Sequence, residues 1–310
     1  MSKKIIFMGT PLFAVPILKS LYQNGYPISV VYTQPPQKSD RGQKLNKSPI
    51  QNIAEALNID FRVPQTLKDN YDEYNFLKSL NADLAIVVAY GQIIPKNFLN
   101  LTKEGFINIH GSILPKWRGA APIQRSIMNL ESETGISIMK IVEELDSGPV
   151  CSIYKIKIDQ NQNAEEISEK LSNLAAEKIL DNIDEIFENK AKFIDQDHSQ
   201  ATYAKKIKKL EGEIVWSDLP LKIIGKINGL FPTPGAFFKF GGERYKILKA
   251  ETGNGIGKVG EVISDKLEIA CGKNKSIKIL EIQRQGRKPQ KIGEFVLGSK
   301  IKKGIVLSNA

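Results

Sequence analysis

Six apolar residues in succession, Leu84 to Ala89, restrict the fold of this chain more than any other feature of its sequence. A strand without alternating polar residues has both faces buried, which is typical of a parallel sheet covered by helices on both sides. Shorter apolar runs lie at residues 4–8 and 28–32, and the segments 13–22 and 50–57 that follow them have helical spacing. The sequence therefore predicts an α/β fold that begins with a Rossmann-like domain.

The pattern changes after a long amphipathic helix predicted over residues 164–188. Residues 190–204 are polar and lack periodicity, which is typical of a linker. Beyond them, short alternating runs separated by glycines predict the strands of a small antiparallel barrel. We therefore expect a first domain over residues 1–189 and a second over residues 205–310. The expected strands of the second domain lie at residues 244–248, 258–263, 266–270 and 276–280.

The positive charge of the chain is concentrated in its last third. The net charge is +10, yet residues 1–190 hold 21 Lys and Arg against 22 Asp and Glu. Residues 191–310 hold 23 Lys and Arg against 12 Asp and Glu. A generally lysine-rich surface would explain the abundance of cations but not their uneven distribution. The asymmetry favours a second domain that contacts nucleic acid.

The sequence lacks the patterns that are typical of several other classes of protein. No apolar stretch has the length of a transmembrane helix, and the first apolar run is too short for a signal peptide, so we expect a cytoplasmic protein without a membrane partner. The first strand is not followed by Gly-x-Gly-x-x-Gly, which argues against a dinucleotide cofactor. Cys151 and Cys271 have no histidines at zinc spacing, so no metal is expected.

The strand predicted at residues 105–110 carries two polar side chains two positions apart. Residues i and i+2 of a strand share a face, so Asn108 and His110 project together while Ile107 and Ile109 turn to the other side. In an open α/β sheet, ligands bind at the carboxyl ends of the strands. An amide and an imidazole at such an end can donate a hydrogen bond and move a proton. Taken alone, such a histidine is more often structural than catalytic.

A carboxylate follows the next apolar strand, in the stretch Glu144-Leu145-Asp146-Ser147-Gly148. By itself this stretch favours a turn. An aspartate in a turn can also serve catalysis, and the sequence contains only two histidines, His110 and His198, with which Asp146 could act.

Six segments carry a resemblance to a known family: Ile6-Phe7-Met8-Gly9-Thr10-Pro11, Val88-Ala89-Tyr90-Gly91, Asn108-Ile109-His110-Gly111-Ser112, Trp117-Arg118-Gly119-Ala120-Ala121-Pro122-Ile123-Gln124, Glu133-Thr134-Gly135 and Leu145-Asp146-Ser147-Gly148. They resemble the folate-dependent formyltransferases, and within them the branch whose acceptor is methionine carried by initiator tRNA. The resemblance covers nearly the whole chain and is most specific between residues 108 and 124. One departure is Ile113, where the family usually has leucine. In this family the second domain is an OB-like barrel, which agrees with the antiparallel pattern.

The resemblance implies formyl transfer from 10-formyltetrahydrofolate to an amine, with three catalytic residues. Asn108 would donate its amide to the negative oxygen of the tetrahedral intermediate. His110 would do likewise or move protons. Asp146 would orient the imidazole and favour its charged form. Which of these groups receives the proton of the amine stays open.

The resemblance also implies a folate site beside these residues. The segment after the strand would bind the pterin and aryl body through apolar side chains and backbone groups. A second segment, after the run at residues 84–89, would line the same pocket. The predicted folate-binding residues are Ser112, Ile113, Leu114, Pro115, Tyr90, Gly91 and Gln92.

Two basic segments are predicted to bind tRNA. The stretch from Gln34 to Ser48 is long for a connection between a strand and a helix, and in the family an insertion here enters the acceptor stem of the tRNA. Its composition alone also fits a solvated loop. The second segment follows the predicted linker, and charge runs often mark only a solvated face. The predicted tRNA-binding residues are Lys38, Arg41, Lys44, Lys47, Lys205, Lys206, Lys208 and Lys209, with a continuation over Arg284, Arg287, Lys288 and Lys291.

The expected partners are initiator methionyl-tRNA and folate, and the chain is expected to be a monomer. Three alternatives remain open. The acceptor could be a sugar nucleotide or glycinamide ribonucleotide, although the basic segments argue against both. Water could replace the amine, which would make the protein a formyltetrahydrofolate hydrolase. The chain could also be a non-enzymatic RNA-binding protein, although the presence of Asn108, His110 and Asp146 argues against it.

Overall fold

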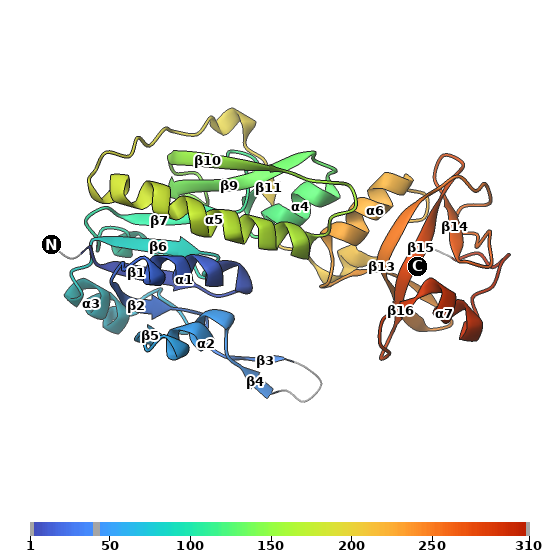
Figure 1. Ribbon diagram of the computed structural model, residues 1–310, viewed down its shortest axis with the longest axis horizontal. Helices are drawn as coiled ribbons and strands as arrows, with labels where there is room; N and C mark the ends of the chain where they lie inside the picture. Colours follow the sequence, from blue (N-terminus) through green and yellow to red (C-terminus); the bar gives the residue numbers. More distant parts are fainter. Residues whose placement is uncertain (1–2, 40–43, 308–310) are drawn as a thin grey trace. The chain divides into compact units, whose positions relative to one another are not determined.

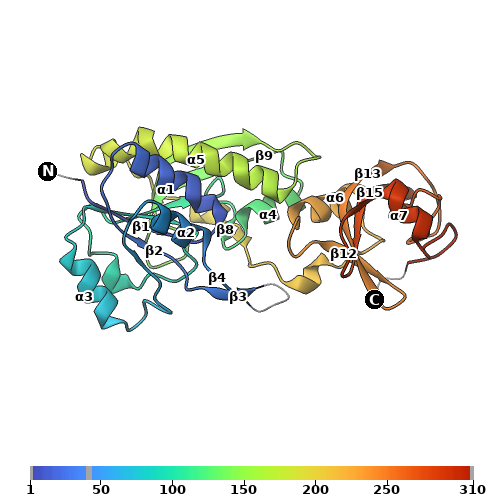
Figure 2. The same ribbon diagram turned by 60° about the horizontal axis from the view of Figure 1, so that its bottom comes forward.

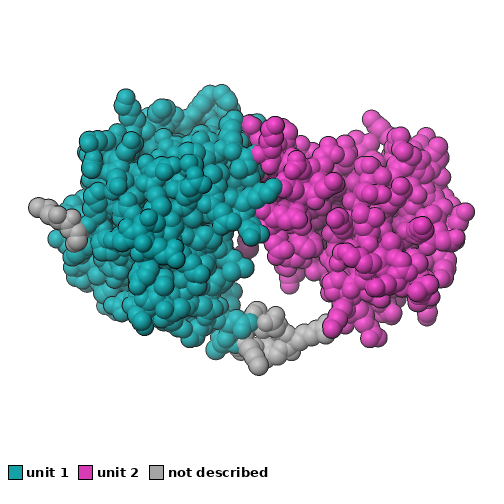
Figure 3. Space-filling model, in the orientation of Figure 1, with its two compact units in different colours: residues 1–119, 134–156, 168–203 teal, residues 120–133, 157–167, 204–310 magenta. Residues whose placement is uncertain are grey.

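The computed structural model describes residues 3–39 and 44–307. The chain forms two compact units, which Figure 3 shows in different colours. Unit 1 comprises residues 1–119, 134–156 and 168–203, and unit 2 comprises residues 120–133, 157–167 and 204–310. The boundaries that we expect from the sequence, at residues 189 and 205, remain a prediction.

Unit 1 is built on a mostly parallel sheet (Figure 1). Among the described residues its strand order is β10-β9-β7-β6-β1-β2-β5. Strands β1, β2, β5, β6 and β7 run parallel to one another, whereas β9 runs antiparallel to β7. The chain leaves β1 on one side through β2 and returns on the other through β6, so the order reverses beside β1. The strands are β1 (Ile5–Gly9), β2 (Ile28–Tyr32), β5 (Phe61–Arg62), β6 (Leu84–Val88), β7 (Phe106–His110), β9 (Glu133–Lys140) and β10 (Val150–Lys157).

Both faces of the parallel sheet are covered, as the apolar run at residues 84–89 predicts. Every residue of β6 is buried. On one face, Ile6, Met8 and Val87 pack with Leu77 of helix α3 (Tyr71–Ser79). On the other face, helices α1 (Val15–Gln23) and α5 (Ala164–Phe187) lie side by side in Figures 1 and 2. The Ser20 hydroxyl of α1 donates to the Ala176 carbonyl of α5 at 2.7 Å. The Ser172 hydroxyl of α5 donates to the carbonyl of Phe13, just before α1, also at 2.7 Å. The α/β class with a Rossmann-like sheet is therefore confirmed.

Helix α2 (Pro49–Ala56) begins where the sequence predicts it. The Ser48 hydroxyl accepts a hydrogen bond of 2.9 Å from the backbone N–H of Gln51, and proline occupies the first helical turn. A serine cap satisfies a donor that the helix itself leaves free, and proline has no N–H to satisfy there. The segment before it differs from the expected loop, because β3 (Gln37–Ser39) and β4 (Lys44–Asn46) pair antiparallel.

Unit 2 contains an antiparallel sheet with the order β12-β13-β15-β14, and β16 pairs with β15. Its core includes Trp216, Phe238 and Tyr245. Helix α7 packs on this sheet (Figure 2). Its Phe295 ring contacts that of Tyr245 edge to face, with ring centroids 6.0 Å apart. The predicted antiparallel second part is confirmed, and its closure into an OB-like barrel remains a prediction. The elements are β12 (Ala236–Phe240), β13 (Glu243–Gly253), β14 (Glu268–Cys271), β15 (Lys275–Arg284), β16 (Gln290–Lys291), α4 (Pro122–Met128), α6 (Pro220–Gly229) and α7 (Ile292–Gly298).

The strand expected at residues 258–263 is wrong. This segment makes only isolated bridges, from Glu261 to Val306 and from Val262 to Ile269. Gly260 has a φ of 83° and lies so close to Leu307 that a Cβ would stand 2.3 Å from its carbonyl oxygen. A left-handed residue in the middle of the run interrupts the extended backbone that alternation predicts.

None of the helices in the described ranges is both long and apolar enough to span a membrane.

Candidate active site

The three predicted catalytic side chains meet in unit 1. Asn108 and His110 project from the carboxyl-terminal half of β7, and Asp146 lies in the loop between β9 and β10. The Asn108 Nδ2 donates to Asp146 Oδ1 at 3.4 Å, and the His110 Nδ1 lies 3.6 Å from Asp146 Oδ2. Ile107 and Ile109 are buried on the other side of the strand. The structure therefore brings together an amide, an imidazole and a carboxylate that are up to 38 residues apart.

Backbone geometry aims the Asp146 carboxylate at the end of β7. Asp146 has a φ of 49°, in the left-handed region that aspartate tolerates better than most residues. Its Oδ2 accepts a hydrogen bond of 2.8 Å from the backbone N–H of Gly119. Two residues later, Gly148 lies against β9, where a Cβ would stand 2.0 Å from the Lys140 carbonyl oxygen. The turn predicted for this stretch thus also carries the catalytic candidate.

A backbone carbonyl fixes the orientation of the His110 ring. His110 Nε2 lies 2.9 Å from the carbonyl oxygen of Trp117. A carbonyl can only accept, so Nε2 carries a hydrogen and donates it. In the neutral ring, Nδ1 is then the nitrogen with a free lone pair, and it faces the Asp146 carboxylate.

The predicted folate segment after β7 forms a tightly bonded loop. Ser112 is fully buried, and its hydroxyl donates to the Lys116 carbonyl at 2.6 Å. The Ser137 hydroxyl of β9 donates to the Ser112 carbonyl at 2.7 Å and accepts from the Leu114 N–H at 3.1 Å. The Leu114 side chain is buried as well, whereas Ile113 and Pro115 are half-buried. Local bonds therefore occupy the Ser112 hydroxyl, and Ile113 and Pro115 keep exposed apolar surface.

The second predicted folate segment lies where three parallel strands end. The Tyr90 carbonyl, beyond β6, accepts from the Thr10 hydroxyl at 2.8 Å and from Gln34 Nε2 at 3.3 Å, which follow β1 and β2. The Tyr90 ring is buried in the core, and burial raises the pKa of its phenol, so the phenol stays protonated. Gly91 is exposed with a φ of 85°, and Gln92 Nε2 donates to the Pro64 carbonyl at 2.8 Å. The exposed groups of this segment are thus Gly91 and part of Gln92.

The basic residues predicted before α2 are described only in part. Lys38 lies in β3 and Lys44 in β4, which pair in a hairpin. Arg41 lies outside the described residues. Lys47 is exposed and forms an ion pair of 2.8 Å with Glu55.

The basic residues of the second predicted segment lie in unit 2 and are exposed. Within the described ranges none of Lys205, Lys206, Lys208 and Lys209 pairs with a carboxylate. Arg125 of α4 donates to the Lys205 carbonyl at 3.0 and 3.1 Å and pairs with Glu211 at 2.6 Å. The backbone around this cationic surface is therefore anchored while its side chains face solvent.

The basic residues of the predicted continuation differ in their partners. Arg284 pairs with Glu243 and Lys291 with Glu281, both at 2.7 Å. Arg287 and Lys288 are exposed.

Sequence reasoning missed the groups that hold the predicted catalytic side chains in place. The Trp117 carbonyl and the Gly119 N–H belong to a segment that carries the family resemblance, but no spacing rule assigns a role to backbone atoms. Arg118, between them, is buried and donates to the side chain of Gln196 at 2.8 and 3.1 Å. Gln196 lies in the stretch predicted as a linker, whose lack of periodicity gave no signal.

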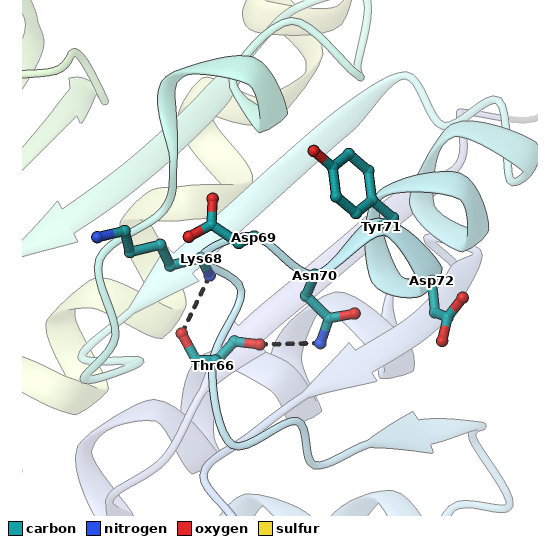
Figure 4. Close-up of a pocket in the computed structure, with 6 residues that line it drawn as sticks. All are labelled: Thr66, Lys68, Asp69, Asn70, Tyr71 and Asp72. Carbon is teal, nitrogen blue, oxygen red and sulfur yellow. Dashed lines mark hydrogen bonds between the residues drawn. The ribbon is translucent and has the colours of Figure 1, made fainter.

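A shallow hollow of about 380 Å³ precedes α3 and contains none of the predicted site residues (Figure 4). Its polar groups bond to each other: Asn70 Nδ2 donates to the Thr66 carbonyl, and the Lys68 N–H donates to the Thr66 hydroxyl, both at 3.0 Å. Asn70 Oδ1 also accepts from the Glu73 N–H at 3.1 Å. These bonds shape the start of the helix, and we assign the hollow no chemistry.

Comparisons with solved structures agree with this fold. The chain is similar to WlaRD, described as a sugar 3N-formyl transferase, with a TM-score of 0.67 at 20% identity over 93% of this chain and 100% of the other. It is also similar to an N-formyltransferase from Helicobacter canadensis, with a TM-score of 0.69 at 20% identity over 90% of this chain and 99% of the other.

Comparisons of sequence identify the family. A methionyl-tRNA formyltransferase of Pelagibacter ubique is 69% identical over 309 residues, which is 100% of both chains. One from Mesorhizobium japonicum is 40% identical over 99% of this chain and 100% of the relative. Residues 3–183 match the formyl transferase family, and residues 206–300 match the formyl transferase C-terminal domain. With the side chains of Asn108, His110 and Asp146 gathered at the end of β7, the chain belongs to the formyl transferase family.

Proposed function

We propose that this chain transfers the formyl group of 10-formyltetrahydrofolate to the α-amino group of methionine carried by initiator tRNA. The observation that carries the proposal is the meeting of Asn108, His110 and Asp146 at the end of β7 in a chain 69% identical, over its full length, to a methionyl-tRNA formyltransferase. Because its acceptor is a charged tRNA, we infer that the protein acts in the cytoplasm.

The site chemistry supports acyl transfer between two nitrogens. The amine must lose a proton as it attacks the formyl carbon, the carbonyl oxygen becomes negative, and the departing folate nitrogen must gain a proton. Asn108 can donate its amide to that oxygen, a contribution worth about 3–4 kcal/mol of barrier for one well-placed donor. His110 Nδ1 is the nitrogen that can take up and release a proton, and it lies 3.6 Å from the Asp146 carboxylate. We propose that Asp146 stabilises the imidazolium while the proton is held.

The residues for the folate body remain a proposal, and the geometry refines it. Ser112 and Leu114 have buried side chains, so their contribution would come from backbone groups. Ile113 and Pro115 keep exposed apolar surface that suits a flat aromatic ligand. Gly91 can bring its backbone close to a ligand because it lacks a side chain.

The exposed lysines of residues 205–209 support tRNA binding through phosphates. Cations without a carboxylate partner can neutralise phosphates and release counterions. We propose that Arg41 and its neighbours Lys38, Lys44 and Lys47 contact the acceptor stem, and that Arg41→Ala chiefly reduces the use of tRNA. Unchanged kinetics with the tRNA substrate in this variant would count against that role.

Turnover with matched acceptors tests the proposed function. The protein is incubated with 10-formyltetrahydrofolate and, in parallel, methionine-charged initiator tRNA, methionine-charged elongator tRNA, an amino sugar nucleotide, glycinamide ribonucleotide and no acceptor. We expect formylation of the initiator tRNA alone. Loss of the formyl group without an acceptor would indicate a hydrolase, and turnover of a small acceptor would indicate another formyltransferase. Binding of tRNA without turnover would indicate an RNA-binding protein.

The salt dependence of tRNA binding tests the cationic surface. If Lys206 and Lys208 each contact a phosphate, replacing either with alanine should weaken binding and lower the slope of log K against log salt by about 1. Lys300 is a matched control because it is an exposed lysine of the same unit outside the segment. An equal slope in wild type and both variants would contradict the assignment.

A further inference from the structure

Gln196 has a buried side-chain amide with all four of its hydrogen-bonding positions used. It is 8% exposed. Its Nε2 donates to the backbone carbonyls of Asp146 at 2.9 Å and Gly148 at 2.7 Å. Its Oε1 accepts from Nε of Arg118 at 3.1 Å and from Nη2 at 2.8 Å. An amide has two N–H donors and one oxygen with two lone pairs, so this geometry leaves no capacity free.

These bonds link the two segments that hold the catalytic pair. Arg118 stands between Trp117, whose carbonyl accepts from His110, and Gly119, whose N–H donates to the Asp146 carboxylate. Gln196 connects the side chain of Arg118 to the backbone of Asp146. Asp146 is thus held at two points: its side-chain carboxylate accepts from the Gly119 N–H, and its backbone carbonyl accepts from Gln196.

The arrangement has features that a simple core contact would not need. Arg118 is 3% exposed, and in the described part of the chain its guanidinium binds the Gln196 oxygen and His198 Nδ1, at 3.3 Å, with no carboxylate paired to it. A buried cation held by neutral acceptors costs free energy unless its bonds are well made. Asp146 itself has a left-handed backbone, which only surrounding contacts maintain. The buried cation and the left-handed backbone are each unfavourable, and both occur where Gln196 joins Arg118 to the loop that carries the Asp146 carboxylate.

We propose that Gln196 is a positioning residue of the formyl-transfer site: its amide clamps the 146–148 loop to Arg118 and so sets the distance between the Asp146 carboxylate and the His110 ring. The inference rests on the proposed function for its catalytic consequence. It gives the stretch of residues 190–204, which sequence predicts to be only a linker, a part in the catalytic geometry. Gln196 acts through Asp146 and touches no reacting atom in this role.

Gln196→Glu keeps one set of the Gln196 hydrogen bonds and removes the other. A carboxylate at this position still accepts from Arg118, but it cannot donate to the carbonyls of Asp146 and Gly148 and repels them instead. Gln196→Met keeps the volume and removes both sets of bonds. Asn182→Asp is the matched control, because Asn182 is also a buried amide of unit 1 that donates to a carbonyl, at 2.7 Å, and it lies outside the catalytic machinery.

The full-length variants are compared for kcat, for KM of both substrates and for thermal stability. The ¹⁵N signals of the two histidine rings are recorded without substrate and assigned with His198→Asn. We expect Gln196→Glu and Gln196→Met to lower kcat by about 10- to 100-fold with KM nearly unchanged, since a displacement of about 1 Å can cost on the order of 100-fold. The His110 ring signals should shift in both variants and stay unchanged in Asn182→Asp.

Wild-type kcat in the Gln196 variants would overturn the proposal. A loss of kcat that Asn182→Asp shares, with unchanged His110 signals, would also overturn it, because it would reflect stability alone. If the wild type forms no formylmethionyl-tRNA, the proposed function fails. The His110 signals then decide the inference by themselves, because they need no substrate.

Discussion

Gly148→Ala should misplace the Asp146 carboxylate, which we propose to be catalytic, and the structure gives the size of the displacement. A Cβ at position 148 would stand 2.0 Å from the carbonyl oxygen of Lys140, whereas real Cβ atoms do not come closer than 3.0 Å. The obstacle is backbone of β9, which cannot rotate away as a side chain can. The loop therefore has to move by about 1 Å, and overpacking of this kind costs about 1–3 kcal/mol of stability.

Asp146 lies two residues before this glycine, so the displacement reaches the active site. A shift of about 1 Å in a catalytic group can cost on the order of 100-fold in rate. We expect kcat for formylation of methionyl initiator tRNA to fall by about that factor, with a smaller change in KM. Initial rates at saturating substrates, measured well below the unfolding temperature of the variant, give this number.

Ser147→Ala is the control in the same loop. It removes a hydrogen bond of 3.1 Å from the Ser147 hydroxyl to the Glu144 carbonyl and adds no atom. It should cost about 0.5–1.5 kcal/mol of stability and leave kcat close to that of the wild type. A Gly148→Ala protein with wild-type kcat would refute the reasoning, because the loop could then absorb the added methyl without moving Asp146.

Three further predictions concern the proposed role of His110, helix packing and acid stability. His110→Ala should lower kcat by about 10²–10⁴-fold in steady-state assays with an unchanged circular dichroism spectrum. Gly229→Ala should destabilise unit 2 by about 1–3 kcal/mol in urea unfolding, because the new Cβ would stand 2.6 Å from a side chain of α4, whereas alanine at the open Gly293 should stabilise by about 0.5–1 kcal/mol. The hydrogen bond from Arg125 lowers the pKa of Glu211, so this pair stabilises the fold above the unfolded glutamate pKa of about 4.3 and loses its effect as pH falls through the folded value. The stability difference between wild type and Glu211→Gln should therefore shrink between neutral pH and strongly acidic pH, and a constant difference would contradict the assignment.

Local patterns were sufficient for the elements that carry the site. The apolar run of β6 predicted a sheet buried on both faces, and the alternation around Asn108 predicted that its amide shares a face with His110. The helical spacing of residues 50–57 predicted helix α2. Each of these predictions depends on the chemistry of neighbouring residues, so no tertiary information was needed.

Predictions failed where contact between backbone segments overrides the preference indicated by composition. The alternating run at residues 258–263 is broken because Gly260 must pass close to Leu307. Part of the connection between β2 and α2 folds as a hairpin, although its composition fits a loop. In both cases the deciding partner is a backbone, and composition does not describe how backbones approach each other.

By itself the sequence determined the α/β class, the strand with its amide and imidazole, and the identity of the carboxylate that could join them. Only the tertiary structure decided that β9 runs antiparallel to β7, that the Trp117 carbonyl orients the imidazole, and that Gln196 holds the loop of the carboxylate. The physical reason is separation along the chain. Periodicity reports how a residue relates to its near neighbours, whereas a hydrogen bond across 50 residues exists only once the intervening strands have been ordered in space.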